Sequence, residues 1–212
     1  MPDKKITRRV GLTLGFSLLL GLILVGTGCS RQDIALAGTD APAQRLYTAW
    51  NLWCENPDRM YCINYQVGSK IPAGTEVTNV QIYRLYRPFR FTHDVIRFTT
   101  VPEGRTYTVF MEERFHPGVD IRSYKEAMFT PKNFEQLTAA MSPTEVKSIR
   151  EGTLYMGMSR EAVQACYGLP FQSRTPSLTN NMWVYPTNRW GLQELTFNPE
   201  GKLAAFRNIS NR

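Results

Sequence analysis

Residues 142–170 read SPTEVKSIREGTLYMGMSREAVQACYGLP, and this stretch carries the start and stop signals of two consecutive helices. Ser142, followed three residues later by Glu145, has the spacing of a capping box, in which each side chain bonds the backbone N–H of the other residue. Gly152 is the typical residue just past a helix end. The first part of the stretch therefore predicts a helix that begins after Ser142, ends at Gly152 and turns Ile149 inward.

The second part of the stretch predicts another short helix. Ser159 is a favoured N-cap residue, and Val163 follows on an apolar helical face. Gly168 lies just past the last apolar residue and Pro170 lies beyond it, which is the usual way for a helix to end. The connecting residues 153–156 are long enough to form an extra strand between the two helices.

Strand signals follow the helices. Residues 182–185, 190–197 and 203–209 are rich in aromatic and aliphatic side chains, and residues 198–201 read NPEG, a turn sequence. We expect three antiparallel strands with helices on one side of the sheet and water on the other.

A further helix is predicted just before the quoted stretch. Thr130 is a favoured N-cap residue, Pro131 suits the first helical position, and Phe134, Leu137 and Met141 recur on one face. The C-terminal domain of helices and a three-stranded sheet is therefore predicted to cover residues 129–212.

The N-terminal half carries mainly strand signals. Residues 71–115 contain runs of β-branched and aromatic side chains, including residues 89–92, 95–101 and 107–111. Residues 102–105 read PEGR and suit a hairpin turn. The pattern predicts an antiparallel meander of three or four strands.

A short amphipathic helix is predicted before the meander. Leu46, Ala49, Trp50 and Trp53 fall at helical spacing, and the two tryptophans are expected to be core residues. Helix and meander together form a predicted domain over residues 44–128, which makes the fold class α+β.

Several motifs of the C-terminal third resemble the SmpA/OmlA (BamE-like) lipoprotein domain. They are Gly157-Met158-Ser159 at a helix start, Val163 within that helix, Gly168-Leu169-Pro170 at its end and the strand Trp183-Val184-Tyr185. The resemblance covers residues 142–208. It implies an α-α-β-β-β module and a non-enzymatic role in outer-membrane or envelope assembly through contacts with envelope proteins.

A second resemblance concerns the meander. The turn Gly74-Thr75-Glu76-Val77 that opens it is similar to the turn of SH3-like small barrels. This likeness implies that the meander is SH3-like, and it implies no particular ligand.

The N-terminus has the order of a secretory signal. Four cations within residues 1–9 precede an uncharged run over residues 10–28. Small residues lead up to Cys29, which resembles the lipobox of bacterial lipoproteins, so residues 1–28 are predicted to be a signal peptide and Cys29 to be acylated. Residues 29–43 would then be a lipid-anchored tether.

Two other interpretations of this segment stay open. The uncharged run is long enough to span a bilayer as an uncleaved helix, and Arg8-Arg9 is reminiscent of a twin-arginine signal. Ser30 after the cysteine resembles lipoproteins that are sorted to the periplasmic face of the outer membrane. Anchoring in the inner membrane, facing the periplasm, is the alternative.

Charge argues against nucleic acid as a partner. Removing residues 1–28 takes away four cations and one anion, which lowers the formal net charge from +7 to +4. The remaining cations are not arranged in long blocks, so the predicted partners are the membrane, through the lipid, and envelope proteins.

The cysteines have separate predicted roles. Cys54 and Cys62 are close in sequence and are expected to form a disulfide in an oxidising compartment. A metal site would need His93 and His116, the only histidines, so no metal or other cofactor is predicted. Cys166 lies on an apolar helical face and is interpreted as a small buried side chain, not a nucleophile.

No sequence motif of an enzyme is present, so no catalytic residue is assigned and binding is the leading hypothesis. The candidate partner-binding residues are Arg189 and Trp190, together with Tyr83, Arg84 and Tyr86, because Trp, Tyr and Arg dominate interface energetics. A packed aromatic core with solvated arginines is the competing interpretation of each group. The alternative functions are a periplasmic binder of a lipid or cell-wall ligand and an enzyme that acts on the cell wall.

Replacing Cys29 by Ser should abolish lipid labelling and leave an uncleaved or soluble species, because the acylated thiol is the predicted anchor. Incorporation of labelled fatty acid and membrane fractionation measure this. A Ser variant that stays in the membrane at its original apparent mass would instead favour the helix anchor.

Overall fold

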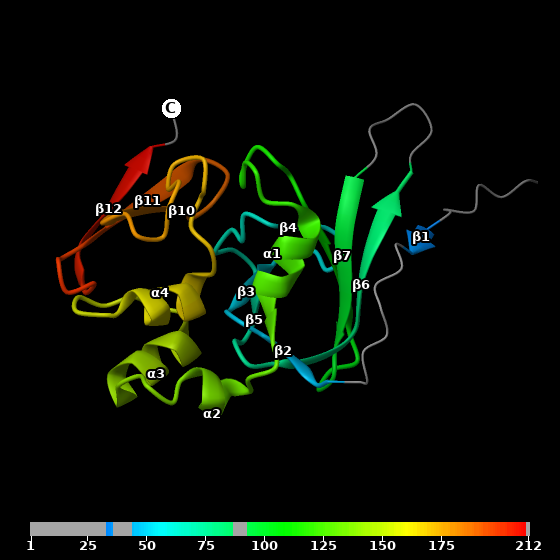
Figure 1. The fold of residues 1–212 in the computed structure, drawn as a ribbon, viewed down its shortest axis with the longest axis horizontal. Helices are drawn as coiled ribbons and strands as arrows, with labels where there is room; N and C mark the ends of the chain where they lie inside the picture. Colours follow the sequence, from blue (N-terminus) through cyan, green and yellow to red (C-terminus); the bar gives the residue numbers. More distant parts are fainter. Residues whose placement is uncertain (1–32, 36–43, 87–92, 211–212) are drawn as a thin grey trace, which may run out of the picture. The chain divides into compact units, whose positions relative to one another are not determined.

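The computed structural model describes residues 33–35, 44–86 and 93–210. The predicted signal peptide, Cys29, most of the tether and the expected strand residues 89–92 lie outside the described residues. Residues 31–212 form one compact unit. Its mixture of helices and strands confirms the α+β class (Figure 1).

The N-terminal half is built on a seven-stranded sheet with the order β4-β8-β7-β6-β2-β9, and β1 pairs with β6. Its central strands β6, β7 and β8 form the predicted antiparallel meander, and only β4 pairs in parallel, with β8. The strands are β1 (Asp33–Ala35), β2 (Leu46–Thr48), β4 (Met60–Tyr61), β6 (Glu76–Leu85), β7 (His93–Thr100), β8 (Thr106–Phe110) and β9 (Phe129–Thr130).

The predicted helix over residues 46–53 is wrong. The segment forms β2 and β3 (Leu52–Cys54), and β3 pairs with β5 (Ser69–Ile71) in a small separate sheet. Every residue from 48 to 54 is buried except Ala49 and Trp53, which are partly exposed. Burial alternates with the period of two of a strand only within β3, where Leu52 and Cys54 are buried and Trp53 is not, and the apolar side chains of the segment also fit a helical spacing.

Helix α1 (Ile121–Met128) was not predicted. The Asp120 side chain caps it by accepting hydrogen bonds from the backbone N–H groups of Arg122 and Ser123. Its buried residues Tyr124 and Met128 join the core of the N-terminal half. A helix of only two turns with two core residues gives a weak periodic signal.

The helix predicted over residues 130–141 is shorter and starts later. Helix α2 spans only Phe134–Leu137, and its N-cap is Asn133, which forms a capping box with Gln136. Thr130 is unavailable as a cap because β9 pairs with β2 at this point. Thr130, which the sequence predicts as the N-cap, is therefore part of the sheet, and the helix begins after Asn133.

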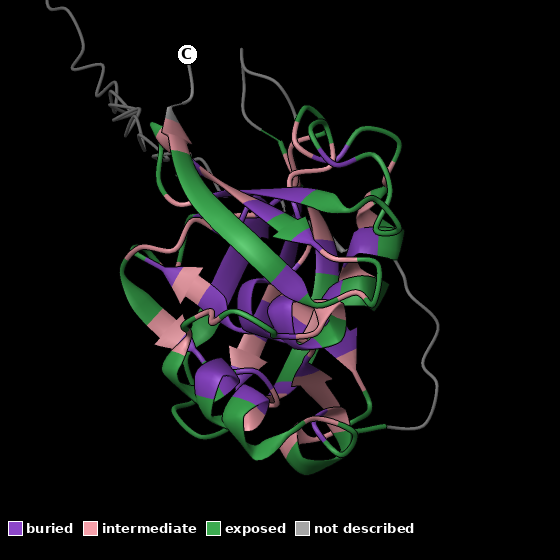
Figure 2. Ribbon diagram, turned by 90° about the vertical axis from the view of Figure 1, so that its left-hand side faces the viewer, coloured by how far each residue is buried: buried purple, intermediate pink, exposed green. Residues whose placement is uncertain are grey.

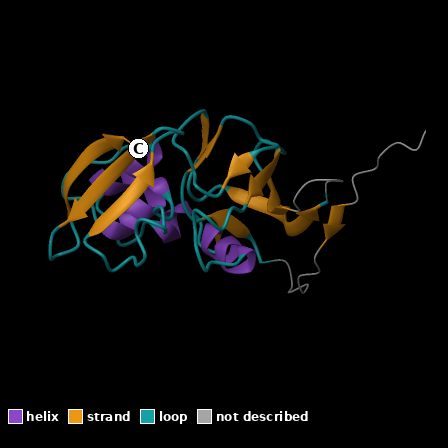
Figure 3. Cartoon of the chain, turned by 90° about the horizontal axis from the view of Figure 1, so that it is seen from above, coloured by secondary structure: helices purple, strands orange, loops and turns teal. Residues whose placement is uncertain are grey.

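The chain after α2 has the predicted order of elements. Helices α3 (Pro143–Glu151) and α4 (Arg160–Tyr167) precede the antiparallel sheet β10-β11-β12, and these helices lie against the sheet (Figure 3). Gly152 adopts φ +76°, the left-handed conformation that lets the chain leave α3. Residues 153–156 form no strand.

The three strands of this sheet are β10 (Met182–Pro186), β11 (Gly191–Phe197) and β12 (Leu203–Ser210). Val163 and Trp183 are buried in one core, as the sequence predicts, with exposed fractions of 0% and 1%. The outer strand β12 faces the viewer in Figure 2 and is largely exposed after Leu203. The sheet therefore has a covered inner part and an open outer strand.

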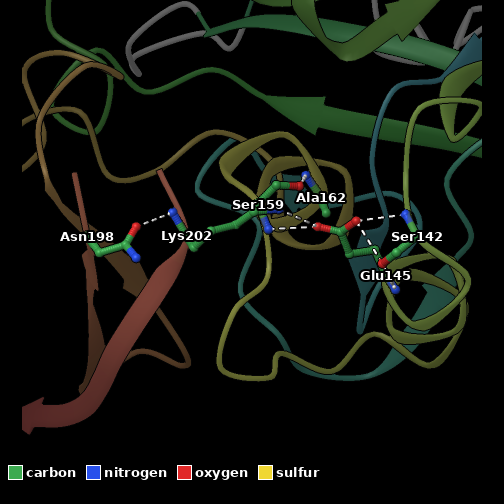
Figure 4. A network of polar contacts seen from close by, with 6 residues as sticks. All are labelled: Ser142, Glu145, Ser159, Ala162, Asn198 and Lys202. Carbon is green, nitrogen blue, oxygen red and sulfur yellow. Dashed lines mark hydrogen bonds and ion pairs between the residues drawn. The ribbon is translucent and has the colours of Figure 1, made fainter. Parts of the chain in front are cut away.

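The carboxylate of Glu145 connects the starts of both helices (Figure 4). It accepts hydrogen bonds from the backbone N–H of Ser142 and of Ser159, each at 2.8 Å, and Lys202 lies 3.7 Å away as an ion-pair partner. Burial alone would raise the pKa of Glu145, but hydrogen bonds from Ser159 and Ser142 outweigh burial and lower the pKa from 4.5 to about 2. The residue is buried with its charge satisfied at two positive helix ends.

Replacing Glu145 by Gln should lower the free energy of unfolding at pH 7 by about 1–3 kcal/mol, because a buried charged acceptor is lost. The folded-state pKa is depressed, so this stabilisation is present above pH 4.5 and is lost as the pH falls toward 2. Urea unfolding at several pH values measures both effects.

Glu161→Gln is the matched control, because Glu161 lies in the first turn of α4 and is exposed. The role of Glu145 would be contradicted if the parent and the Glu145→Gln variant had equal free energies of unfolding at pH 7, or if the difference between them were the same at pH 7 and at pH 3.

Candidate functional site

A hollow of about 710 Å³ lies between two segments that are far apart in the sequence. One wall comes from residues 53–67, which include β4, and the other from residues 188–190, the turn between β10 and β11. Four aromatic side chains line it, namely Trp53, Tyr61, Tyr65 and Trp190. Its volume lies within the usual range for ligand sites.

Buried hydrogen bonds fix the wall of residues 53–67. Asn64 has φ +52° and a buried side chain, and its Oδ1 accepts the backbone N–H of Trp53 at 3.0 Å. Farther along this wall, the backbone N–H of Thr108 on β8 donates to the carbonyl of Pro57 at 2.8 Å. The aromatic side chains of this wall therefore project from a backbone that is tied to the sheet.

The opposite wall is a tight turn. The side-chain oxygen of Asn188 accepts hydrogen bonds from the backbone N–H groups of Trp190 and Gly191, both at 2.8 Å. Thr187 donates its N–H to the carbonyl of Gly191 at 2.9 Å, which closes the hairpin. The turn holds Arg189 and Trp190 outward, and Trp190 is 73% exposed.

Positive charges lie over the aromatic rings of the hollow. The guanidinium of Arg59 is 5.7 Å from the ring centroid of Tyr61, and that of Arg189 is 5.9 Å from Trp190. Within the described part of the chain, neither arginine has a carboxylate partner. Glu55 is the one acidic residue of the lining.

Burial and neighbouring positive charges shift the pKa of the Tyr65 phenol in opposite directions. Burial raises the pKa of Tyr65, and the positive charges of Arg114 and Arg189 oppose that rise. Arg114 is paired with Glu112, whose negative charge adds to the rise in the pKa of Tyr65.

The predicted partner-binding residues divide into two groups. Arg189 and Trp190 line the hollow, whereas Tyr83, Arg84 and Tyr86 do not. Arg84 donates two hydrogen bonds to Asp94 on the neighbouring strand β7, at 2.7 and 3.1 Å, so its charge is already matched.

The tyrosines of that second group also lie elsewhere. Tyr83 donates its hydroxyl to Gln81, and the guanidinium of Arg97 lies 4.7 Å from the centroid of its ring. Tyr86 is 66% exposed at the end of β6. These residues form a surface of the N-terminal sheet that is separate from the hollow.

Sequence reasoning missed Trp53, Arg59, Tyr61 and Tyr65 as site residues. It placed Trp53 in the core of a helix that does not form, and the three others were not considered. The available signal was Arg59 among the three aromatic residues of residues 53–65, a stretch that also contains the turn residues Asn56-Pro57.

In the structure Cys54 and Cys62 are buried and are not bonded to each other, so the pairing expected from the sequence stays a prediction. The Cys62 sulfur accepts the backbone N–H of Glu112 at 3.4 Å, which directs it toward the loop after β8. Cys54 lies on β3 and is paired with β5. Burial raises the pKa of Cys62 to about 12, which leaves a neutral and unreactive thiol at neutral pH.

Cys166 is fully buried, as the sequence predicts. Burial raises the pKa of its thiol to about 12. Over the described ranges of the chain, no three His, Cys, Asp or Glu residues are grouped as metal ligands would be. In the same ranges, no helix has the length and apolarity needed to cross a membrane.

Comparison of the chain with protein-family models, with curated proteins and with solved structures finds no match.

All three buried thiols should resist alkylation by iodoacetamide in the native Cys29→Ser chain at pH 8 and react fully after unfolding without reductant. Burial and the raised pKa of Cys62 and Cys166 leave very little accessible thiolate. Mass spectrometry counts the adducts. If Cys54 and Cys62 react in the unfolded chain only after a reductant is added, the two residues form the disulfide that the sequence predicts.

Proposed function

We propose that this chain is a non-enzymatic envelope lipoprotein that is anchored through Cys29 and supports outer-membrane or envelope assembly by binding a partner protein. The hollow lined by Trp53, Tyr61, Tyr65 and Trp190 is the observation that carries this proposal. The predicted location is the periplasmic face of the outer membrane, with the inner membrane as the alternative.

The composition of the hollow supports a protein contact. Tryptophan, tyrosine and arginine contribute most of the binding energy at protein interfaces, and all three line this site. Trp190 exposes most of its surface on a turn that Asn188 holds in place. Such an anchor loses little conformational freedom when a partner covers it.

The family relationship is part of the proposal. Two helices followed by a three-stranded antiparallel sheet are the order that the resemblance to the SmpA/OmlA (BamE-like) domain implies, and α3, α4 and β10 to β12 have this order. The three-stranded meander of β6 to β8 supports an SH3-like interpretation of the N-terminal half. The lipoprotein signal before Cys29 supports the location.

A photo-crosslinking residue at position 190 should form a covalent adduct with a discrete protein in intact cells, because Trp190 lies at the hollow. The matched control is position 206 on β12, where Phe206 is 41% exposed outside the hollow. Isolation of the adduct under denaturing conditions and mass spectrometry identify the partner.

Adducts of equal yield from positions 190 and 206 would contradict a site at the hollow. Adducts of position 190 with lipid or glycan alone would contradict a protein partner and favour a binder of lipid or cell-wall material.

A further inference from the structure

We propose that the hollow binds an acidic peptide segment of the partner protein, whose carboxylates pair with Arg59 and Arg189 while its apolar side chains contact the aromatic residues. This inference rests on the proposed function, because it names the chemistry of the segment that the hollow would receive.

The charge of the hollow favours an anionic ligand. Arg59 and Arg189 both line it, and they face a single acidic lining residue, Glu55. Across residues 44–86 and 93–210, no carboxylate forms an ion pair with either arginine. An exposed cation without a partner is ordinary, but two of them on opposite walls of one hollow form an arrangement that an acidic ligand complements.

Other arginines of the chain show how such a pair would be made. Arg84 binds Asp94 through Nε at 2.7 Å and Nη2 at 3.1 Å, and Arg207 binds Glu194 through Nε at 2.9 Å and Nη2 at 2.8 Å. Arg84 contacts both oxygens of Asp94, which is the favoured bidentate geometry, whereas both nitrogens of Arg207 contact one oxygen of Glu194. The same donors of Arg59 are not engaged by a side chain of the described residues, nor are those of Arg189.

Each guanidinium lies near an aromatic ring of the hollow. The distance from the guanidinium to the ring centroid is 5.7 Å for Arg59 and Tyr61 and 5.9 Å for Arg189 and Trp190, which is within cation–π range. A contact of this kind uses none of the N–H donors of a guanidinium, so these donors stay free for a carboxylate.

The rest of the lining suits apolar side chains. Met60 and Val67 also line the wall over residues 53–67. A ligand with only negative charge would leave these groups without complementary contacts. A peptide that carries both acidic and apolar residues complements the two arginines and this apolar wall together.

Fluorescence anisotropy of a short labelled peptide of alternating aspartate and leucine tests the inference, with the full-length chain in an uncharged detergent. The peptide should bind, and its affinity should fall as salt concentration rises. The Arg59→Gln/Arg189→Gln double variant should bind at least about tenfold more weakly, since two charge-assisted pairs are lost. The chain's melting temperature should stay unchanged, because both arginines are exposed.

The matched control is the Arg84→Gln/Arg207→Gln double variant, which removes two arginines outside the hollow and should bind like the parent. A peptide of alternating asparagine and leucine should bind weakly or not at all. Equal binding of the two peptides, or equal binding by the Arg59→Gln/Arg189→Gln variant and the parent, overturns the inference. Arginine-dependent binding of anionic vesicles or soluble cell-wall fragments, with no binding of the acidic peptide, also overturns it.

The crosslink at position 190 separates the two proposals. A protein adduct at position 190 whose yield is unchanged by the Arg59→Gln/Arg189→Gln substitutions would overturn the acidic segment and leave the protein-binding function standing. Loss of that adduct in the variant supports the acidic segment.

Discussion

Two buried asparagine side chains hold the halves of the chain together. Asn51 donates a hydrogen bond from Nδ2 to the carbonyl of Ile149 in the last turn of α3, at 2.8 Å, and Asn64 donates to the carbonyl of Tyr167 at the end of α4, at 2.9 Å. Carbonyls in the last turn of a helix lack an i+4 partner within the helix, and leaving one buried without any hydrogen bond costs about 1–3 kcal/mol. The carbonyl of Ile149 also accepts the backbone N–H of Gly152 at 3.2 Å, so Asn51 adds a second hydrogen bond there. Asn51 also accepts the backbone N–H of Ala73 at 2.8 Å. The N-terminal half therefore completes the helices of the C-terminal half, which is consistent with residues 31–212 forming one compact unit.

The same amides determine where the hollow lies. Asn64 bonds α4 through its Nδ2 and Trp53 through its Oδ1, so one side chain links the C-terminal helices to the wall over residues 53–67. The opposite wall over residues 188–190 belongs to the sheet that packs on those helices. A site made from both halves requires their interface to be rigid, and buried amides with all these bonds formed give that interface one preferred arrangement.

Local chemistry made the C-terminal half predictable. Ser142 and Glu145 bond each other's backbone within four residues, and Gly152 needs only its own left-handed conformation, so these signals are complete within a short window. The segment at residues 46–53 differs, because its apolar residues fit both a helix and a strand. Pairing of β2 with β6 and β9 decides between them, and that pairing depends on residues far along the chain. Of the candidate site, the exposed turn with Arg189 and Trp190 could be named from composition, whereas the opposite wall could not, because its position follows from contacts of Asn64 across more than a hundred residues.

The free thiols follow from the same packing. Proximity in sequence suggested that Cys54 and Cys62 would pair, but the chain between them turns through Asn56 and places Cys62 after a strand of the larger sheet. There the carbonyl of Cys62 accepts the hydroxyl of Tyr124 at 2.7 Å, which fixes its backbone in the core. Disulfide exchange requires a thiolate, and a pKa of about 12 makes that form of Cys62 very rare. The packing that joins the two halves also buries both thiols, which limits the access of a reagent to them.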